Sequence, residues 1–343
     1  MGLSGISRRR VLAAGAGLIG GTPSLALAQG VARIERLSPG LDRVLVDTQP
    51  IKRLAEGFGG PLGAVEGPLW WPEGGYLLFS DIQNDRRLRY QPGAGVSVDK
   101  QGVNRHNGLT RDTKGRLVAC ERDTRRVVRF EPDGETTVIA SSYQSHRLSR
   151  PNDVIVKADG AIYFSDPLRP DVPDAWDVQS AGLYRVAADL GSITLLRGDF
   201  VMPNGLAFSP DEKYLYVNDT LRRHIRRIEL APQGALLPAG GLLGQTDTVF
   251  FIFSGSERGT IDGMKVDVAG NVYCGGPGGL WILDPQGVAL GRIVHGEPAT
   301  SNMAFGGPEL KTLYFTSRTH LGSVELKISG CPVPARAPPP EAS

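Results

Sequence analysis

Three features of the 343-residue sequence predict an all-β chain, a six-bladed β-propeller formed by residues 29–330. Gly and Pro supply 45 and 25 residues, a share of about 20% against about 12% in average proteins, which is typical of short elements joined by turns. The hydrophobic content of 41% is high enough for a packed core. One polar–small–apolar unit also recurs six times along the chain, at the spacing of propeller blades.

Each repeat begins with a polar residue, here termed its lead residue, which is followed by a short apolar strand, a turn and a second apolar strand. The lead residues are Glu66, Asn107, Asn152, Asn204, Asp262 and Asn302. The intervals between them are 41, 45, 52, 58 and 40 residues, close to the roughly 40–50 residues of a propeller blade. Most of the turns carry Gly or Asp, as at Asp159-Gly160. Residues 41–58 are a candidate for the strand that closes the ring.

The amino terminus, residues 1–28, is predicted to be a twin-arginine signal peptide. Three arginines at 8–10 precede a short apolar stretch that ends in a small-x-small motif at 26–28. The alternative is a retained membrane anchor, but the stretch is too short and too rich in glycine to span a bilayer. We therefore expect a periplasmic or secreted protein whose mature form has no membrane partner. The Pro/Ala-rich tail, residues 331–343, is expected to be disordered.

Charge and motif content exclude several classes of function. Without the leader, the chain has 35 basic and 36 acidic residues, which argues against a nucleic-acid partner. The three cysteines and five histidines form no metal-binding motif of the zinc type, and no G-x-S-x-G is present. A G-x-G-x-x-G match at 15–20 lies inside the leader and follows no strand, so no nicotinamide cofactor is predicted.

The lead residues are expected to converge at one end of the central channel, because the innermost strands of all blades run along it. Six oxygen-bearing side chains, two of them acidic, are costly to bury without a compensating charge. Such donors suit a hard divalent cation, and Ca²⁺ is favoured because it accepts about six to eight oxygen ligands in loose geometry. The alternative is that each asparagine is a turn former bound to its own backbone. Because Glu66 is not a turn former, metal binding is favoured for the set.

Four further acids lie 14 or 15 residues after a lead residue, and we term them the strand-end acids. They are Asp81, Glu121, Asp166 and Asp219. A two-stranded hairpin returns to the face where it began, so these acids are expected near the lead residues but farther from the axis. One interpretation is that they orient metal ligands. The alternative, solvated acids in the next turn, is favoured for Asp81 and Asp219.

Several longer motifs carry a family resemblance. They include Val65-Glu66-Gly67-Pro68-Leu69-Trp70, Arg150-Pro151-Asn152-Asp153-Val154, residues 203–211 (PNGLAFSPD) and Asp262-Gly263-Met264-Lys265-Val266-Asp267. The chain resembles the gluconolactonase/regucalcin (senescence marker protein) family over about residues 60–326. The resemblance implies a six-bladed propeller that hydrolyses lactones with one divalent ion, usually Ca²⁺.

The resemblance also implies roles for individual residues. The implied metal ligands are Glu66, Asn152, Asn204 and Asp262. Asp262 would also be the catalytic acid–base residue, and Arg150 and Asn107 would contact the substrate. Glu121, in the family-like segment 119–122, joins the predicted substrate-binding set. The predicted cofactor is one divalent cation, Ca²⁺, with Mg²⁺, Mn²⁺ and Zn²⁺ as alternatives.

The predicted function is hydrolysis of a sugar lactone or related lactone, a small molecule, to the hydroxy acid. The cation would polarise the carbonyl, and Asp262 would act as general base because Ca²⁺ acidifies water far less than zinc does. The alternatives are a phosphotriesterase-like hydrolase and a non-catalytic calcium- or ligand-binding propeller. Arg122 and segment 168–173 depart from the family pattern and are expected near the substrate pocket. The particular lactone and the oligomeric state are therefore left open.

Overall fold

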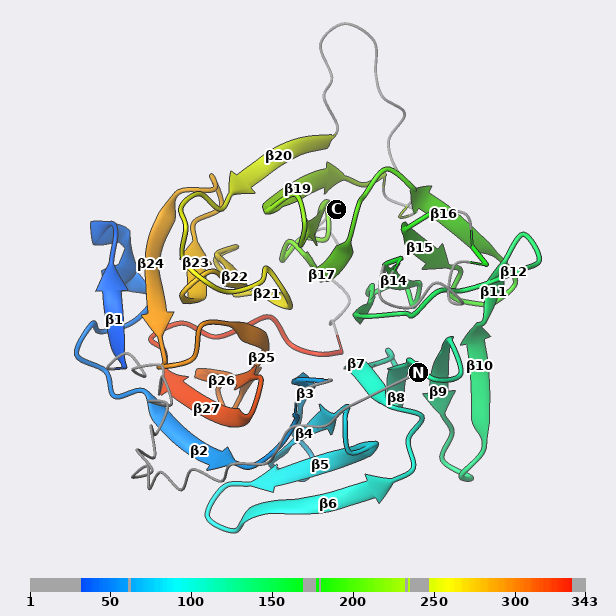
Figure 1. Ribbon diagram of the computed structural model, residues 1–343, viewed down its shortest axis with the longest axis horizontal. Coiled ribbons are helices and arrows are strands. Elements are labelled where there is room, and N and C mark those ends of the chain that lie inside the picture. Colours follow the sequence, from blue (N-terminus) through cyan, green and yellow to red (C-terminus); the bar gives the residue numbers. More distant parts are fainter. Residues whose placement is uncertain are drawn as a thin grey trace, which may run out of the picture.

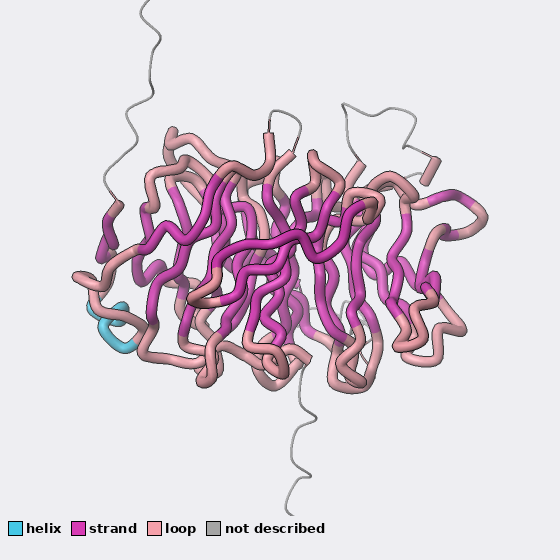
Figure 2. The backbone as a smooth tube through the Cα atoms, turned by 90° about the horizontal axis from the view of Figure 1, so that it is seen from below, coloured by secondary structure: helices cyan, strands magenta, loops and turns pink. Residues whose placement is uncertain are grey.

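The computed structural model describes residues 32–60, 63–168, 177–178, 180–231, 234 and 247–334. Six of its sheets are arranged as blades around a central axis, which confirms the predicted all-β six-bladed propeller (Figure 1). Seen from the side, the strands stand between two layers of loops (Figure 2). The predicted leader, residues 1–28, and residues 335–343 of the predicted tail lie outside the described ranges. Within those ranges no helix has the length and apolar character needed to cross a membrane.

The first four blades follow one another in the chain, each with its innermost strand first. Blade 1 consists of β3 (Val65–Trp71), β4 (Tyr76–Asp81), β5 (Arg86–Gln91) and β6 (Gly95–Gln101). Blade 2 consists of β7 (His106–Arg111), β8 (Leu117–Glu121), β9 (Arg126–Phe130) and β10 (Thr136–Ala140). Blade 3 consists of β13 (Val154–Val156), β14 (Ile162–Asp166), β15 (Gly182–Val186) and β16 (Ile193–Arg197). Blade 4 consists of β17 (Pro203–Phe208), β18 (Tyr214–Asp219), β19 (His224–Glu229) and β20 (Asp247–Ile252).

The last two blades take strands from both ends of the described chain. Blade 5 consists of β21 (Met264–Val266), β22 (Val272–Gly276), β23 (Gly279–Leu283) and β24 (Ala289–Val294), with β1 (Arg33–Arg36) at its outer edge. Blade 6 consists of β25 (Thr300–Gly306), β26 (Thr312–Ser317), β27 (His320–Glu325) and β2 (Lys52–Glu56). The remaining elements are a 3-10 helix, η1 (Pro39–Arg43), and a small hairpin of β11 (Ser142–Tyr143) and β12 (His146–Arg147).

Strand β2 closes the ring. It pairs antiparallel with β27, with Lys52 opposite Ser323, so a segment that precedes blade 1 completes blade 6. The expectation that residues 41–58 supply the closing strand is confirmed. The fifth strand of blade 5, β1, was not predicted, because its four residues have no counterpart in the other repeats.

The core lies between the blades. The second strand of each blade is buried almost throughout, as in β4, where Leu77 and Phe79 are fully inaccessible. Each blade is covered on both faces by its neighbours, so its middle strands bury consecutive apolar residues rather than alternate ones. Burying one such side chain contributes about 1.5–3 kcal/mol. Packing between blades therefore holds the inner strands around the axis.

Glycine follows the lead residue in four of the six repeats, and each of these glycines touches the next blade. They are Gly67, Gly108, Gly205 and Gly263. A Cβ on Gly67 would lie 2.2 Å from the carbonyl oxygen of Asn107, and one on Gly263 would lie 2.1 Å from the Asn302 side chain. The missing side chain thus permits neighbouring inner strands to approach closely, which brings successive lead residues together. Strand β3 is irregular at this point, with a register shift between Glu66 and Leu69.

The substitution Gly67→Ala tests this close approach, with Gly93→Ala as the matched control. Both glycines have positive φ, +53° at Gly67 and +82° at Gly93, but a Cβ on Gly93 would meet nothing within 4 Å. We expect Gly93→Ala to lower the free energy of unfolding by roughly 1–2 kcal/mol, the cost of the left-handed conformation alone. Gly67→Ala should cost about 1–3 kcal/mol more, because the backbone of Asn107 must move. Urea unfolding curves measure the loss of unfolding free energy in each variant. Equal losses in the two variants would contradict the proposed role of the contact between Gly67 and Asn107.

Candidate functional site

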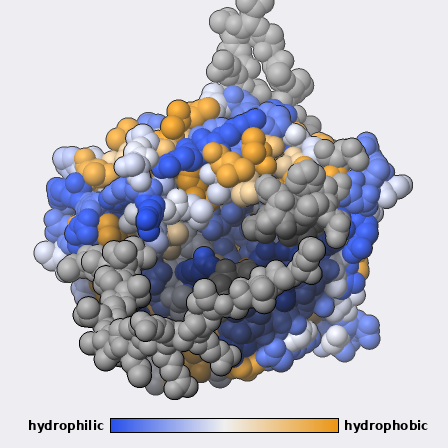
Figure 3. Space-filling model, viewed as in Figure 1, coloured by the Kyte–Doolittle hydropathy of each residue, from blue (hydrophilic) through white to orange (hydrophobic). Residues whose placement is uncertain are grey.

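A polar cavity of about 250 Å³ opens at the end of the channel where the lead residues lie. Five of the six lead residues line it: Glu66, Asn107, Asn152, Asn204 and Asp262. The space-filling view shows the molecule hollowed near its centre, with hydrophilic residues in the hollow (Figure 3). Residues far apart in the sequence, from blades 1 to 5, are thus gathered in one place.

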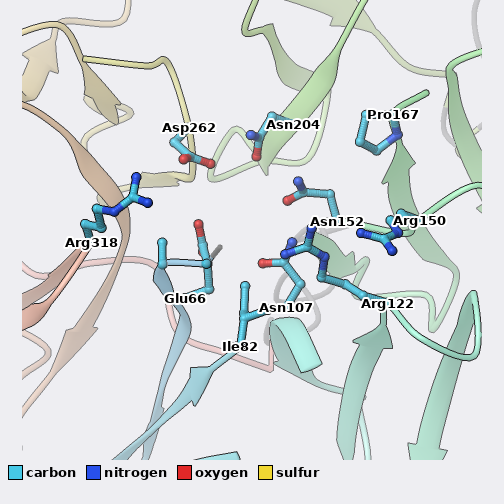
Figure 4. A pocket seen from close by; sticks show the side chains of 12 residues that line it. Glu66, Ile82, Asn107, Arg122, Arg150, Asn152, Pro167, Asn204, Asp262 and Arg318 are labelled. Carbon is cyan, nitrogen blue, oxygen red and sulfur yellow. The ribbon is translucent and has the colours of Figure 1, made fainter. Parts of the chain in front are cut away.

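The side chains of the cavity are directed toward a common space (Figure 4). The carboxylates of Glu66 and Asp262 and the carboxamide of Asn204 face one another across it, and Asn107 and Asn152 lie on its other side. Glu66 comes from β3 and Asn204 from β17, whereas Asp262 lies two residues before β21. The structure therefore brings together all four predicted metal ligands.

The asparagines of the cavity are not ordinary turn residues. Among the described residues, the side chains of Asn107, Asn152 and Asn204 accept or donate no hydrogen bond, and Oδ1 of Asn107 is buried without a partner. Asn302 behaves differently, because its Oδ1 accepts from the backbone N–H of Met303 at 2.9 Å. The bond to its own backbone that the turn-former alternative requires is thus found at Asn302 alone, although Asn302 lies within β25 rather than in a turn. The carboxamides of the other three have no hydrogen-bond partner among the described residues.

A second polar layer lies beneath the cavity. The amide nitrogen of Asn302 donates to Oε2 of Glu66 at 3.2 Å and to Oδ2 of Asp153 at 3.4 Å. Lys265 donates to Oδ1 of Asn302 at 3.2 Å. Glu66 also accepts from the backbone N–H of Gly67 at 3.1 Å through the same Oε2. These hydrogen bonds fix Oε2 of Glu66. Its other carboxylate oxygen, Oε1, accepts no hydrogen bond from the described residues.

Burial makes negative charge on the carboxylates of this layer unfavourable. Glu66 is 5% exposed; burial raises its pKa to about 7, and the nearby Asp153 carboxylate contributes to the rise. Hydrogen bonds from Gly67 and Asn302 and the charge of Lys265 oppose this change. Burial also raises the pKa of Asp153. Two neighbouring buried carboxylates with one lysine as counter-charge would be stabilised by a cation in the cavity.

The donor set of the cavity fits a hard cation. Within the described parts of the chain, no group of three or more His, Cys, Asp and Glu side chains is suited to hold a metal ion. A cation bound here would combine two carboxylates, Glu66 and Asp262, with carboxamide oxygens. Oxygen ligands of this mixed kind suit Ca²⁺ or Mg²⁺ rather than softer metals.

The strand-end acids lie behind the cavity and hold the segments that lead into the inner strands. Asp166 accepts from the backbone N–H groups of Ser149 at 2.7 Å and Arg150 at 2.6 Å. Asp219 accepts in the same way from Val201 at 2.7 Å and Met202 at 3.2 Å. Asp81 and Asp219 are fully buried, so the interpretation of these two as solvated turn acids is wrong. Their carboxylates are occupied by the protein's own N–H groups.

Glu121, predicted to bind substrate, is not among the described residues that line the cavity. Its carboxylate accepts from Arg126 at 2.7 Å and from Asn104 at 3.0 Å, and Thr124 also donates to it. The next residue, Arg122, lines the cavity instead. Successive side chains at a strand end point in different directions, which separates Glu121 from its neighbour.

One repeat position, of which the sequence analysis singled out only Arg122, supplies much of the cavity wall. The residue directly after the second strand lines the cavity in four blades: Ile82, Arg122, Pro167 and Arg318. Arg318 in blade 6 was missed because blade 6 has no strand-end acid to mark the position; Ser317 stands there. Alignment of the second strands across all six repeats would have found it.

The penultimate residues of three second strands also position lead residues. Ser80 donates to the carbonyl oxygen of Asn107 at 2.9 Å, and Ser165 donates to that of Asn204 at 2.7 Å. The side chain of Asn218 donates to the carbonyl of Asp262. In each case one blade fixes the backbone of the next blade's lead residue, so contacts between neighbouring blades position three of the residues that line the cavity.

Comparison with known proteins supports the family resemblance that the sequence motifs indicate. The family model described as the SMP-30/gluconolactonase/LRE-like region matches residues 64–319. The chain belongs to this family. A gluconolactonase of Zymomonas mobilis is 30% identical to it over 322 residues, 88% of either chain. The pentonolactonase XacC of Haloferax volcanii is 29% identical over 74% of this chain and 80% of its own.

A solved structure is also similar to this chain. The gluconolactonase XC5397 of Xanthomonas campestris matches this protein with a TM-score of 0.74 and 28% identity, covering 88% of this chain and 99% of its own. The family resemblance predicted from the lead-residue motifs is confirmed.

The substitution Asp166→Asn tests whether a strand-end acid positions Arg150. The two backbone N–H donors cannot both be satisfied by a carboxamide, so the segment that carries Arg150 should loosen. With a substrate that Arg150 contacts, we expect KM to rise about tenfold while kcat changes less. Asp267→Asn is the control, because Asp267 is equally buried and also accepts two backbone N–H bonds, but in the turn at the other end of blade 5. An unchanged KM in Asp166→Asn, or an equal rise in Asp267→Asn, would contradict the positioning role.

Proposed function

We propose that this protein hydrolyses a sugar lactone to the corresponding hydroxy acid and that the reaction depends on one divalent cation. The observation that carries the proposal is the set of carboxylate and carboxamide groups around a single cavity, in a chain of this family. The gluconolactonase and pentonolactonase names of relatives at 29–30% identity support a lactone as the substrate. The enzyme would therefore be a hydrolase that acts on an internal ester bond.

The cation would be held by Glu66, Asn152, Asn204 and Asp262. When bound, it supplies Lewis-acid polarisation of the lactone carbonyl. Ca²⁺ is the proposed ion because all four side chains offer oxygen donors. The buried Oδ1 of Asn107, which has no partner among the described residues, would accept a hydrogen bond from a substrate hydroxyl.

Asp262 would move the protons of the reaction. Its carboxylate removes a proton from the attacking water while the new C–O bond forms at the carbonyl carbon. The same proton is then given to the ring oxygen as the ester C–O bond breaks, which leaves a hydroxyl and a carboxylic acid. Arg150, in the wall of the cavity, would contact ring hydroxyls or the carboxylate that appears. Asn302 and Lys265 keep Glu66 in place throughout.

Removal of the cation is the first test. We expect EDTA to abolish turnover in a panel of sugar lactones and added Ca²⁺ to restore it, with Mg²⁺, Mn²⁺ and Zn²⁺ assayed in parallel. Calorimetric titration should give one Ca²⁺ per chain. Full activity in the metal-free protein would contradict the role of the cation. Ca²⁺ binding without turnover of any lactone would indicate a binding protein, and faster turnover of an organophosphate would indicate a phosphotriesterase.

The substitution Asp262→Asn tests the general base. With Ca²⁺ saturation verified by titration, we expect kcat to fall about 10²–10⁴-fold, because the carboxamide cannot accept the proton. Asp133→Asn, in an exposed turn, is the control and should retain wild-type kcat. Full activity of Asp262→Asn with the ion bound would show that another group is the base.

A further inference from the structure

A second cavity, of about 420 Å³, lies between blades 6 and 1, which are neighbours in the ring (Figure 1). Its lining includes Gly75, in the turn after β3, and Gly307 and Pro308, which follow β25. The lead residues stand near the start of these inner strands, so this cavity lies toward the opposite end of the blades. Its volume is within the range of about 300–1,000 Å³ that is usual for small-molecule sites. The described residues that line it are all different from those of the catalytic cavity.

Three aromatic side chains form the apolar part of this second cavity: Trp70, Tyr90 and Tyr314. The rings of Trp70 and Tyr314 are stacked, with centroids 5.7 Å apart and an angle of 11° between their planes. Tyr90 meets Tyr314 edge-on at 6.0 Å. Gly306 permits the stack, because a Cβ at this position would lie 2.7 Å from the ring of Tyr314 and 2.8 Å from that of Trp70. One face of each stacked ring is therefore covered by the other ring.

The polar atoms of these rings have no partner within the protein. Among the described residues, the indole N–H of Trp70 and the hydroxyls of Tyr90 and Tyr314 make no hydrogen bond. Trp70 and Tyr314 are only 8% and 5% exposed, and polar atoms on rings buried to this degree usually have a partner. Neither polar atom is sealed from solvent, so both remain open to a ligand in the cavity that these residues line.

Two charged side chains of the lining also have unused hydrogen-bonding capacity. The hydroxyl of Thr312 lies 3.1 and 3.0 Å from the two carboxylate oxygens of Glu325, which has no cationic partner among the described residues. Lys52 forms no ion pair with any residue that the structure describes. A carboxylate accepts about four hydrogen bonds and an ammonium group donates about three, so both can bind further groups. Burial raises the pKa of Tyr314 to about 12, with contributions from Tyr90 and Glu325, so its hydroxyl keeps its proton at neutral pH.

This combination of groups fits one class of ligand. A quaternary ammonium ion binds over open aromatic faces, whereas Trp70 and Tyr314 cover each other and Lys52 adds a positive charge. A flat aromatic molecule would cover the hydroxyls and the charged groups without pairing them. A sugar ring has C–H groups that pack against aromatic carbon and hydroxyls that both donate and accept. It can therefore satisfy the apolar and the polar parts of the lining together.

We propose that this cavity binds a polyhydroxylated molecule of monosaccharide size. Its C–H groups would pack against Trp70 and Tyr90, and its hydroxyls would bond to Glu325 and to the phenol of Tyr314. A neutral sugar and a sugar acid share this chemistry, and Lys52 would bind the carboxylate of an acid. The proposal does not depend on lactone hydrolysis, because the two cavities have no described lining residue in common.

Titration of the wild-type protein, followed by NMR of the indole N–H groups, tests the proposal. The resonance of Trp70 is assigned by its loss in Trp70→Phe. Methyl β-D-glucopyranoside is the neutral probe and methyl β-D-glucuronide the acidic one, and neither has a lactone bond. We expect at least one of them to shift the Trp70 resonance saturably, with a Kd of about 1–10 mM. No saturable shift with either probe, or tighter binding of choline than of both, would overturn the proposal.

Substitutions identify the groups responsible. Tyr314→Phe removes only a hydroxyl and Glu325→Gln only a charge, and each should weaken the bound probe about tenfold. Lys52→Gln distinguishes the two ligand sources, because it should weaken the glucuronide and leave the affinity for the glucoside unchanged. Tyr214→Phe, at the first residue of β18 in blade 4 and outside the cavity lining, is the control and should bind as the wild type does.

The outcomes separate this inference from the proposed function. Unchanged affinity in both Tyr314→Phe and Glu325→Gln, or an equal loss in Tyr214→Phe, would overturn the second site. All of these variants should hydrolyse lactones with the wild-type kcat/KM, because none lies in the catalytic cavity. Absence of lactone turnover in the wild type would contradict the proposed function alone. Should Tyr314→Phe fail to fold, the titration of the wild-type protein still decides the question.

Discussion

The burial of like-charged oxygen groups at the propeller axis is the constraint on which the rest of the structure depends. Glu66 and Asp153 lie close enough for the charge of Asp153 to raise the pKa of Glu66, and both side chains are buried. Such a pair persists only if it is hydrogen-bonded and counter-charged. Asn302 and Lys265 provide both functions from blades 5 and 6. The site therefore requires that non-neighbouring blades meet at the axis, and the glycines after the lead residues permit this approach.

Three consecutive residues at the end of the second strand have different roles. In blade 3, Ser165 binds the backbone of the next blade's lead residue, Asp166 binds the segment that carries Arg150, and Pro167 lines the cavity. The first two residues fix the backbone that carries the predicted metal ligands and Arg150, whereas the third lines the cavity. Changes at the third position would alter which substrate is accepted without disturbing the framework.

The fold and the lead residues that line the cavity could be predicted from the sequence, because both follow from the repeat. A lead residue identified in one blade predicts its equivalents, and Glu66, Asn204 and Asp262 were placed in one cavity by that reasoning alone. Features that break the repeat were not predictable in this way. Asp153 lies at a position where four of the other five blades have glycine, and β1 has no counterpart at all. Their roles come from contacts between blades, which the pattern of a single repeat does not encode.

The buried layer below the cavity and the wall of the cavity present different charged groups. The lower layer concentrates negative charge at Glu66 and Asp153, which favours a cation above it. Arg122 and Arg318 place two guanidinium groups in the wall of the cavity, at a repeat position filled by Ile82 and Pro167 in other blades. The wall therefore differs from blade to blade, whereas the hydrogen bonds of Asn302 and Lys265 keep the carboxylate of Glu66 in one place below it. Residues of the wall can vary without loss of the buried network that favours a cation.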